Sequence, residues 1–193
     1  LFEEIEEANN NEPITFFEIL TAAYFYNASK YPENINLIEA GLFHRFDATN
    51  ILKNNLASIV TSIGLDHLDW LPENERTTKK IIFEKTSTLL NSNIIIAKQN
   101  SSEIISEIKN SITINSSKKY FFNEDFNYSL NENGFIYYED KDGGMKLPIP
   151  KVKGQFQLEN ISTAIATLRS IEELNVSEKP VSYTHLTLPT KQD

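Results

Sequence analysis

The chain has 193 residues, of which 40% are hydrophobic and 23% charged, as in folded globular proteins. Its formal net charge of -9 at pH 7 argues against binding to nucleic acid or to an anionic membrane, since both need basic surface. It has no cysteine, no apolar run of membrane-spanning length and no signal peptide, which excludes a disulfide framework and a thiolate metal site and predicts a cytoplasmic location.

The first 112 residues predict helices alternating with strands. The opening LFEEIEEANN, without methionine, indicates a helix already begun and predicts that a segment precedes Leu1. A helix is expected in PITFFEILTAAYFYNASK, near Pro13, and strands are expected at INLIEAGL and LASIVTSIGL. A charged helical segment, PENERTTKKIIFEKTSTLL, a strand, NIIIAKQ, and a serine-capped helix, SSEIISEIKNSI, follow. This order predicts a three-layer α/β fold with a mostly parallel sheet.

The sequence changes character at about residues 118–153, where short aromatic runs separated by NENG and KDGG predict a small section of antiparallel hairpins. A last helix is expected in NISTAIATLRSIEEL, with Asn160 as its N-cap. The end of the chain lacks the preceding periodicity, and VSYTHLTLPT is similar to a translated transposon-type sequencing adapter. We therefore predict a partial domain over residues 1–180 and a non-native tail over 181–193, which removes His185 from the candidates.

Polar side chains follow two of the predicted strands. Glu39 ends one strand, and Asp66 and His67 come just after the other. In parallel sheets ligands bind beyond the carboxyl ends of the strands, so these groups could share a crevice and hold a hard cation. The alternative is a surface loop whose aspartates cap the next helix. Lys85 is open to two interpretations as well, a solvated charge or an amine whose pKa is lowered by burial.

Four segments carry a family resemblance: ITFFEILTAAYF, IEAGLFHRFDATN, TSIGLDHLDWL followed by FEK, and LPIPKVKGQFQLENISTAIA. On these segments the sequence resembles the folylpolyglutamate synthase and dihydrofolate synthase family of the Mur ligase superfamily, over most of residues 12–175. The resemblance implies a Mur-ligase-type central ATPase domain in a ligase of folate biosynthesis. Such a ligase uses ATP to convert the carboxylate of dihydropteroate or a folate into an acyl phosphate, which then reacts with L-glutamate.

The resemblance also implies metal and catalytic residues. Glu39 and His67 match the magnesium-binding glutamate and histidine of a family with two Mg²⁺ sites, and His67 is also a catalytic candidate. Lys85 matches a lysine that the family carbamylates. The usual EKAGI is EKTST here, and the spacing from His67 is longer than usual. Lys79 and Lys80 therefore stay open as alternatives to Lys85.

For the substrates, the resemblance implies a pterin pocket that includes Thr15, Phe17 and Asp47, with Phe17 as a stacking surface. It implies ATP contacts at Asn160 and at the adjacent Gln157. Where the family has GLGGR, this chain has GLFHR at residues 41–45, so two bulky side chains replace two glycines.

No phosphate-binding loop occurs in the 193 residues, and by resemblance this loop and a C-terminal domain lie outside them. We therefore expect a monomer that binds small molecules and shows no ligase activity by itself. Two alternatives stay open, another ligase of the Mur superfamily and a non-catalytic binding domain.

Overall fold

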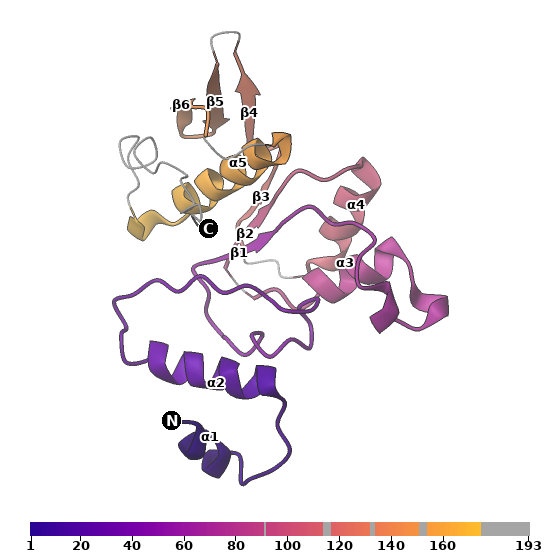
Figure 1. Ribbon diagram of the computed structural model, residues 1–193. Coiled ribbons are helices and arrows are strands. Elements are labelled where there is room, and N and C mark those ends of the chain that lie inside the picture. Colours follow the sequence, from indigo (N-terminus) through magenta and orange to yellow (C-terminus); the bar gives the residue numbers. More distant parts are fainter. Residues whose placement is uncertain (91, 114–116, 132–133, 151–153, 175–193) are drawn as a thin grey trace, which may run out of the picture. The chain divides into compact units, whose positions relative to one another are not determined.

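The computed structural model describes residues 1–90, 92–113, 117–131, 134–150 and 154–174 (Figure 1). The chain divides into two compact units, Leu1–Leu52 and Lys53–Asp193, and each is considered by itself. The domain predicted over residues 1–180 stays a prediction, because two compact units can belong to one domain. The tail predicted at residues 181–193 lies outside the described residues.

The first unit contains two helices, α1 (Phe2–Ala8) and α2 (Phe16–Ala28), which confirm the two helices expected there. The start of α2 is set by a capping box. Thr15 Oγ1 accepts a hydrogen bond from the Glu18 backbone N–H at 3.2 Å, and the Glu18 carboxylate accepts one from the Thr15 backbone N–H at 2.8 Å. These bonds satisfy two of the N–H groups that a helix start would otherwise leave unpaired.

The prediction of a strand at INLIEAGL is wrong. Residues 35–40 pair with no strand of the described chain, and turns and bends occupy most of residues 41–52. Leu37, which a covered sheet would bury, is 89% exposed. An apolar run becomes a strand only where a neighbouring strand satisfies its N–H and C=O groups, and hydropathy alone does not reveal whether that neighbour exists.

In the second unit, β1 (Ala57–Val60), β2 (Asn93–Ile96) and β3 (Lys119–Phe121) form a parallel sheet in the order β1-β2-β3. The central strand β2 is buried on both faces, since the exposed fractions of Ile94, Ile95 and Ile96 are 0%, 0% and 1%. The predicted strands within LASIVTSIGL and NIIIAKQ are therefore confirmed, as is the covered parallel sheet.

A second sheet, antiparallel, contains β4 (Phe126–Leu130), β5 (Phe135–Asp140) and β6 (Gly143–Pro148) in that order. It confirms the hairpin section, and the KDGG segment turns between β5 and β6 with Gly143 at a φ of 114°. One part of that prediction is wrong, because residues 119–121 form β3 of the parallel sheet. Residues 119–121 follow a helix that brings the chain back in the same direction as β2, and their aromatic composition suits either sheet.

The described part of the second unit contains three α-helices, α3 (Thr78–Thr86), α4 (Ser102–Ser111) and α5 (Gln155–Ser170). It also contains three short 3₁₀ turns, at Leu68–Trp70, Glu73–Glu75 and Glu172–Leu174. The helices α3 and α4 pack against each other, and the Ser101 hydroxyl caps α4 as predicted. The prediction that Asn160 caps the last helix is wrong, because α5 begins at Gln155 and Asn160 lies in its second turn.

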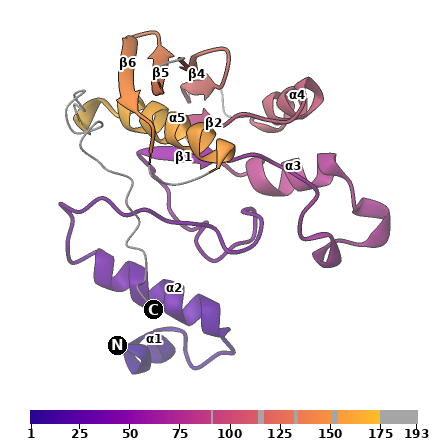
Figure 2. The same cartoon turned by 45° about the horizontal axis from the view of Figure 1, so that its top comes forward.

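The core of the second unit forms around α5, which lies between the two sheets and contacts strands of both (Figure 2). Its buried residues come from β2, from the β4-β5-β6 sheet with its preceding loop, and from α5: Ile95, Phe122, Phe126, Ile136, Tyr138, Met145, Leu147, Leu158, Ile165 and Ala166. Among the described residues, no helix is long and apolar enough to cross a membrane.

Candidate functional site

The Asp47 carboxylate anchors a loop in the first unit. Its Oδ2 accepts hydrogen bonds from the backbone N–H groups of Gly41 and Leu42, both at 3.0 Å. Its Oδ1 accepts bonds from the Thr49 backbone N–H at 2.9 Å and from the Thr49 hydroxyl at 2.5 Å. Burial raises the pKa of Asp47, but the bonds from Thr49, Leu42 and Gly41 outweigh burial and hold that pKa below its ordinary value. The ionised form is therefore the stable one in this loop.

The same loop meets the ring of Phe17. A Cβ atom added to Gly41 would lie 3.0 Å from Phe17 Cζ and 3.3 Å from Asp47 Oδ2, so a side chain at this position would push against both groups. Glycine thus allows the aromatic ring to lie against the backbone. Phe17 and Asp47, two of the three predicted pterin residues, are brought together at Gly41, and Phe17 is still 46% exposed.

Thr15, the third predicted pterin residue, is engaged in the cap of α2. Besides its two capping-box bonds, its hydroxyl donates to Glu18 Oε2 at 2.6 Å. The side-chain and backbone hydrogen bonds of Thr15 lower the pKa of Glu18. The observed role of Thr15 is therefore to fix the helix that carries Phe17, and a direct contact with a ligand stays a prediction.

Phe43 stands in the segment where the family resemblance expects glycines. Its φ of 53° is in the left-handed region, which bulky residues rarely adopt and glycine adopts readily. The GLFHR loop therefore has a left-handed backbone at a position where its side chain makes that conformation costly.

The predicted magnesium ligands lie in different units. Glu39 is an exposed residue of the first unit, in the irregular segment before Gly41. His67 belongs to the second unit, where its Nε2 lies 3.1 Å from Asp66 Oδ2 and its backbone N–H donates to Asp66 Oδ1 at 2.8 Å. The described residues contain no group of three His, Asp or Glu side chains that could hold a metal ion. Magnesium often takes only one or two carboxylates, with water and phosphate completing its shell, so an exposed glutamate fits that chemistry.

The three lysine candidates differ in their surroundings. Lys80 Nζ lies 2.8 Å from Glu75 and 3.2 Å from Glu84; hydrogen bonds to these carboxylates raise the pKa of Lys80. Carbamylation requires the neutral amine, which a raised pKa makes scarce. Lys79 is 78% exposed, whereas Lys85 is half-buried in the last turn of α3. The raised pKa therefore counts against Lys80 as the carbamylated residue.

The predicted nucleotide contacts lie next to each other on α5. Asn160 Nδ2 donates to Gln157 Oε1 at 3.4 Å, one helical turn away. Gln157 is half-buried and Asn160 is exposed. The structure thus brings these two amides together on one face of the helix.

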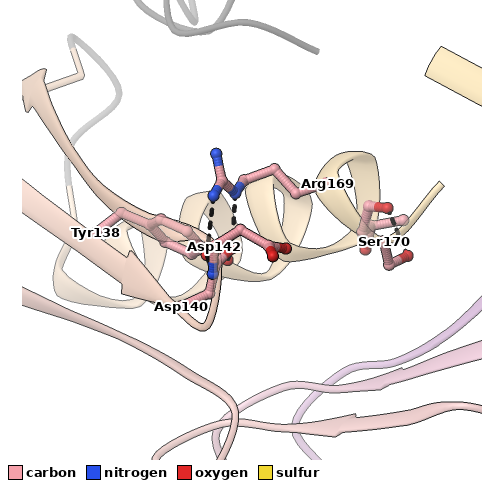
Figure 3. Close-up of polar contacts among 6 residues, drawn as sticks. Tyr138, Asp140, Asp142, Arg169 and Ser170 are labelled. Carbon is pink, nitrogen blue, oxygen red and sulfur yellow. Dashed lines mark hydrogen bonds and ion pairs between the residues drawn. The ribbon is translucent and has the colours of Figure 1, made fainter. Parts of the chain in front are cut away.

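A polar cluster that the sequence did not predict joins β5 to α5 (Figure 3). Asp140 accepts hydrogen bonds from Arg169 at 2.6 and 2.9 Å and from the buried Tyr138 hydroxyl at 2.9 Å. A cavity of about 190 Å³ opens beside it, and none of the predicted site residues lines that cavity. Burial raises the pKa of Asp140, but Arg169 and Tyr138 hold it below its ordinary value. The charges of Asp140 and Arg169 neutralise each other, and their hydrogen bonds link the antiparallel sheet to α5.

The comparisons with known proteins decide the family. No family model matches the sequence. The dihydrofolate synthase/folylpolyglutamate synthase of Escherichia coli (strain K12) is 30% identical over 181 residues, covering 93% of this chain and 40% of that protein. The structure of E. coli FolC in complex with DHPP and ADP superposes with a TM-score of 0.74 at 28% identity, over 94% of this chain and 41% of that one. The chain belongs to the dihydrofolate synthase/folylpolyglutamate synthase family.

Further relatives of the same family match in part. The enzyme of Buchnera aphidicola subsp. Schizaphis graminum is 39% identical over 67 residues, 35% of this chain and 16% of that protein. The apo form of L. casei FPGS superposes with a TM-score of 0.74 over 93% of this chain and 45% of that one, at 21% identity, and so supports the fold alone. The chain spans about two fifths of the E. coli family member. The predicted family and its α/β fold are confirmed.

Sequence reasoning missed Thr49, whose N–H and hydroxyl both bind Asp47 in this loop. Asp47 and Thr49 are two residues apart, the spacing at which an aspartate side chain bonds the backbone in a tight turn. That spacing could have identified Thr49 as a partner of Asp47. The bonds to Gly41 and Leu42, six and five residues away, have no comparable signature in the sequence.

Proposed function

We propose that the protein carrying this chain is an ATP-dependent ligase that joins L-glutamate to dihydropteroate, to folates, or to both, in folate biosynthesis. The observation that supports this most strongly is the 30% identity to the E. coli synthase across 93% of the chain. E. coli FolC, a relative at 28% identity, adds to it by its bound molecules, DHPP and ADP. Because the chain spans a part of each relative, the activity is a proposal for the whole protein.

The proposed reaction has two steps. The substrate carboxylate attacks the γ-phosphorus of ATP, so that an acyl phosphate forms and ADP leaves. The amino nitrogen of glutamate then attacks the acyl carbon, the bond to the phosphate oxygen breaks, and an amide, inorganic phosphate and a proton result. Positioning and charge neutralisation dominate catalysis of phosphoryl transfer, and Mg²⁺ would supply the positive charge.

Three residues are proposed for metal binding and catalysis. Glu39 offers an exposed carboxylate to one Mg²⁺. His67 offers an imidazole that Asp66 orients, as carboxylates orient metal-binding histidines in other proteins. Lys85, once carbamylated, would present an anionic group in place of a cation.

The substrates are proposed to bind at two further places. In the first unit, the exposed face of Phe17 offers a stacking surface for a pterin ring, beside the loop that Asp47 anchors, with Thr15 at the start of the same helix. In the second unit, the amides of Gln157 and Asn160 can each donate and accept hydrogen bonds, which suits the edge of adenine.

Substitution of Glu39 tests the metal assignment in the protein that carries this chain. Glu39→Gln keeps the size of the side chain and removes its charge, so kcat/KM for ATP-dependent glutamate addition should fall about a hundredfold, which corresponds to about 2.7 kcal/mol. Glu33→Gln, at another exposed glutamate of the same unit, is the matched control and should retain wild-type turnover. Full turnover in Glu39→Gln would remove Glu39 from the site.

We further propose that the 193-residue chain alone does not catalyse glutamate addition. It corresponds to 40% of the E. coli relative, and no phosphate-binding loop occurs in its sequence. Incubation with ATP, Mg²⁺, glutamate and either dihydropteroate or a folate should give no product above background. Measurable product from this chain would overturn the proposal.

A further inference from the structure

The loop at residues 41–49 is built so that Asp47 has no hydrogen-bonding capacity left for a ligand. An ionised carboxylate has about four lone-pair sites, and Asp47 accepts four hydrogen bonds within the chain. A substrate donor would have to displace one of them. The geometry therefore points to an indirect role for Asp47, through the Gly41 and Leu42 backbone groups that it binds.

Thr49 holds one oxygen of the Asp47 carboxylate in place, so that the other faces that backbone. Its N–H and hydroxyl both bind Oδ1, which leaves Oδ2 turned toward the N–H groups of Gly41 and Leu42. The hydroxyl bond, at 2.5 Å, is in the short range of charge-assisted hydrogen bonds, which are stronger than neutral ones. Without the hydroxyl, Oδ1 of Asp47 would keep only the bond from the Thr49 N–H.

We propose that Thr49 is a positioning residue of the pterin site, a role that rests on the proposed function. By holding Asp47, Thr49 places the Gly41-Leu42 backbone against the ring of Phe17 and so sets the edge of the stacking surface. The fit is close, because a single added carbon on Gly41 would meet Phe17 Cζ at 3.0 Å. The ligand class that such a surface accepts is a flat heteroaromatic ring.

The strained backbone next to this contact increases the need for an anchor. Phe43, directly after Leu42, has a φ of 53°, which is unfavourable for a bulky residue. If the Asp47 bonds to Gly41 and Leu42 weakened, the loop could relax toward an ordinary conformation and withdraw from Phe17. The position of this loop is therefore sensitive to the loss of one hydroxyl.

Three threonine variants of the protein that carries this chain test the proposal. Thr49→Val removes the hydroxyl at nearly constant volume, Thr49→Ser restores it, and Thr21→Val is the matched control. The Thr21 hydroxyl belongs to the same unit but donates to a helix carbonyl, that of Phe17, at 2.8 Å. For each variant, hydrogen exchange of the peptide containing residues 41–49 reports the loop. Steady-state kinetics then give KM for dihydropteroate and for ATP.

In Thr49→Val we expect faster exchange of the Gly41 and Leu42 amides and a KM for dihydropteroate raised about tenfold, the effect of losing one hydrogen bond to a charged group. The KM for ATP and kcat should stay within about twofold. Thr49→Ser and Thr21→Val should match the wild type in all measurements. A general loss of folding would instead change every parameter together.

The contradicting outcomes are distinct. If the wild-type protein uses dihydropteroate and Thr49→Val leaves its KM unchanged, the inference is wrong and the proposed function stands, whether or not exchange increases. If Thr49→Ser behaves like Thr49→Val, the hydroxyl is not the cause and the inference is wrong. If the wild type uses no pterin substrate at all, the proposed function fails and the inference fails with it.

Discussion

Removal of the Asp140 carboxylate should strongly destabilise the second unit. The side chains of Asp140 and Arg169 are 10% and 16% exposed, and the Tyr138 side chain is fully buried. In Asp140→Ala, a partly buried guanidinium and a buried phenol lose their common acceptor. Loss of one partner of a buried ion pair costs about 3–5 kcal/mol. Because the adjacent cavity of about 190 Å³ can admit water to the guanidinium, we expect the lower end, about 3 kcal/mol.

Urea denaturation followed by circular dichroism measures this loss. Glu172→Ala is the matched control, because Glu172 pairs with Lys118 at 3.0 Å with side chains that are 83% and 63% exposed, and such pairs contribute less than about 1 kcal/mol. Adding Arg169→Met to Asp140→Ala should recover at least about 1 kcal/mol, since no charge then remains buried. A loss below about 1 kcal/mol in Asp140→Ala, or no recovery in the double variant, would refute the reasoning.

Three further predictions concern stability. Phe43→Gly should be more stable than Phe43→Ala by about 1 kcal/mol in denaturant unfolding, because both remove the ring and only glycine tolerates the left-handed backbone; equal stabilities would contradict the assigned strain. Thr15→Ala should lower the unfolding free energy by about 1 kcal/mol through loss of the capping box, whereas Thr15→Ser should retain it. The pKa of both Asp47 and Asp140 is lowered from 3.8, so their stabilising effect is complete above that pH and is lost as the pH falls through the lower folded values. Unfolding measured from pH 6 to pH 2 should show a shallower acid decline in Asp47→Asn than in the wild type.

Sequence patterns correctly predicted the elements whose structure depends on residues close together in the sequence. The cap of α2 depends on Thr15 and Glu18, three residues apart, and the apolar run 94–96 suits a strand buried on both faces. The KDGG turn needs a positive φ at Gly143, which glycine supplies. In these cases the residues that determine the structure are neighbours in the sequence.

The predictions failed where a strand depends on a partner that is distant in the sequence, or where the start of a helix is ambiguous. The apolar residues 35–42 have no strand to pair with in the described chain, and residues 119–121 join the parallel sheet rather than the hairpins. At α5, the residues before Asn160 are already helical, so a good capping residue lies inside the helix. Sequence patterns reflect composition and periodicity, and they do not show which neighbouring strand a segment will pair with.

The same distinction applies to the candidate site, of which one part was predicted from the sequence and another was not. Family resemblance named Phe17 and Asp47, and the structure brings them together at Gly41. Only the structure reveals the contacts of Thr49 and the four hydrogen bonds that Asp47 accepts, because they depend on a contact across six residues of irregular loop. The roles of Glu39, His67 and Lys85 stay predictions, and the Glu39→Gln variant above tests the first of them.

The fate of isotopic oxygen tests the central claim, ATP-dependent ligation through an acyl phosphate, most directly. Dihydropteroate and a folate, each labelled with ¹⁸O in both oxygens of every carboxylate, would be incubated separately with ATP, Mg²⁺, L-glutamate and the protein that carries this chain, and the phosphate analysed by mass spectrometry. The account predicts one ¹⁸O atom in each inorganic phosphate formed, because the carboxylate oxygen that attacks ATP leaves with the phosphoryl group. Amide product accompanied by unlabelled phosphate, or no glutamate-dependent product at all, would contradict it.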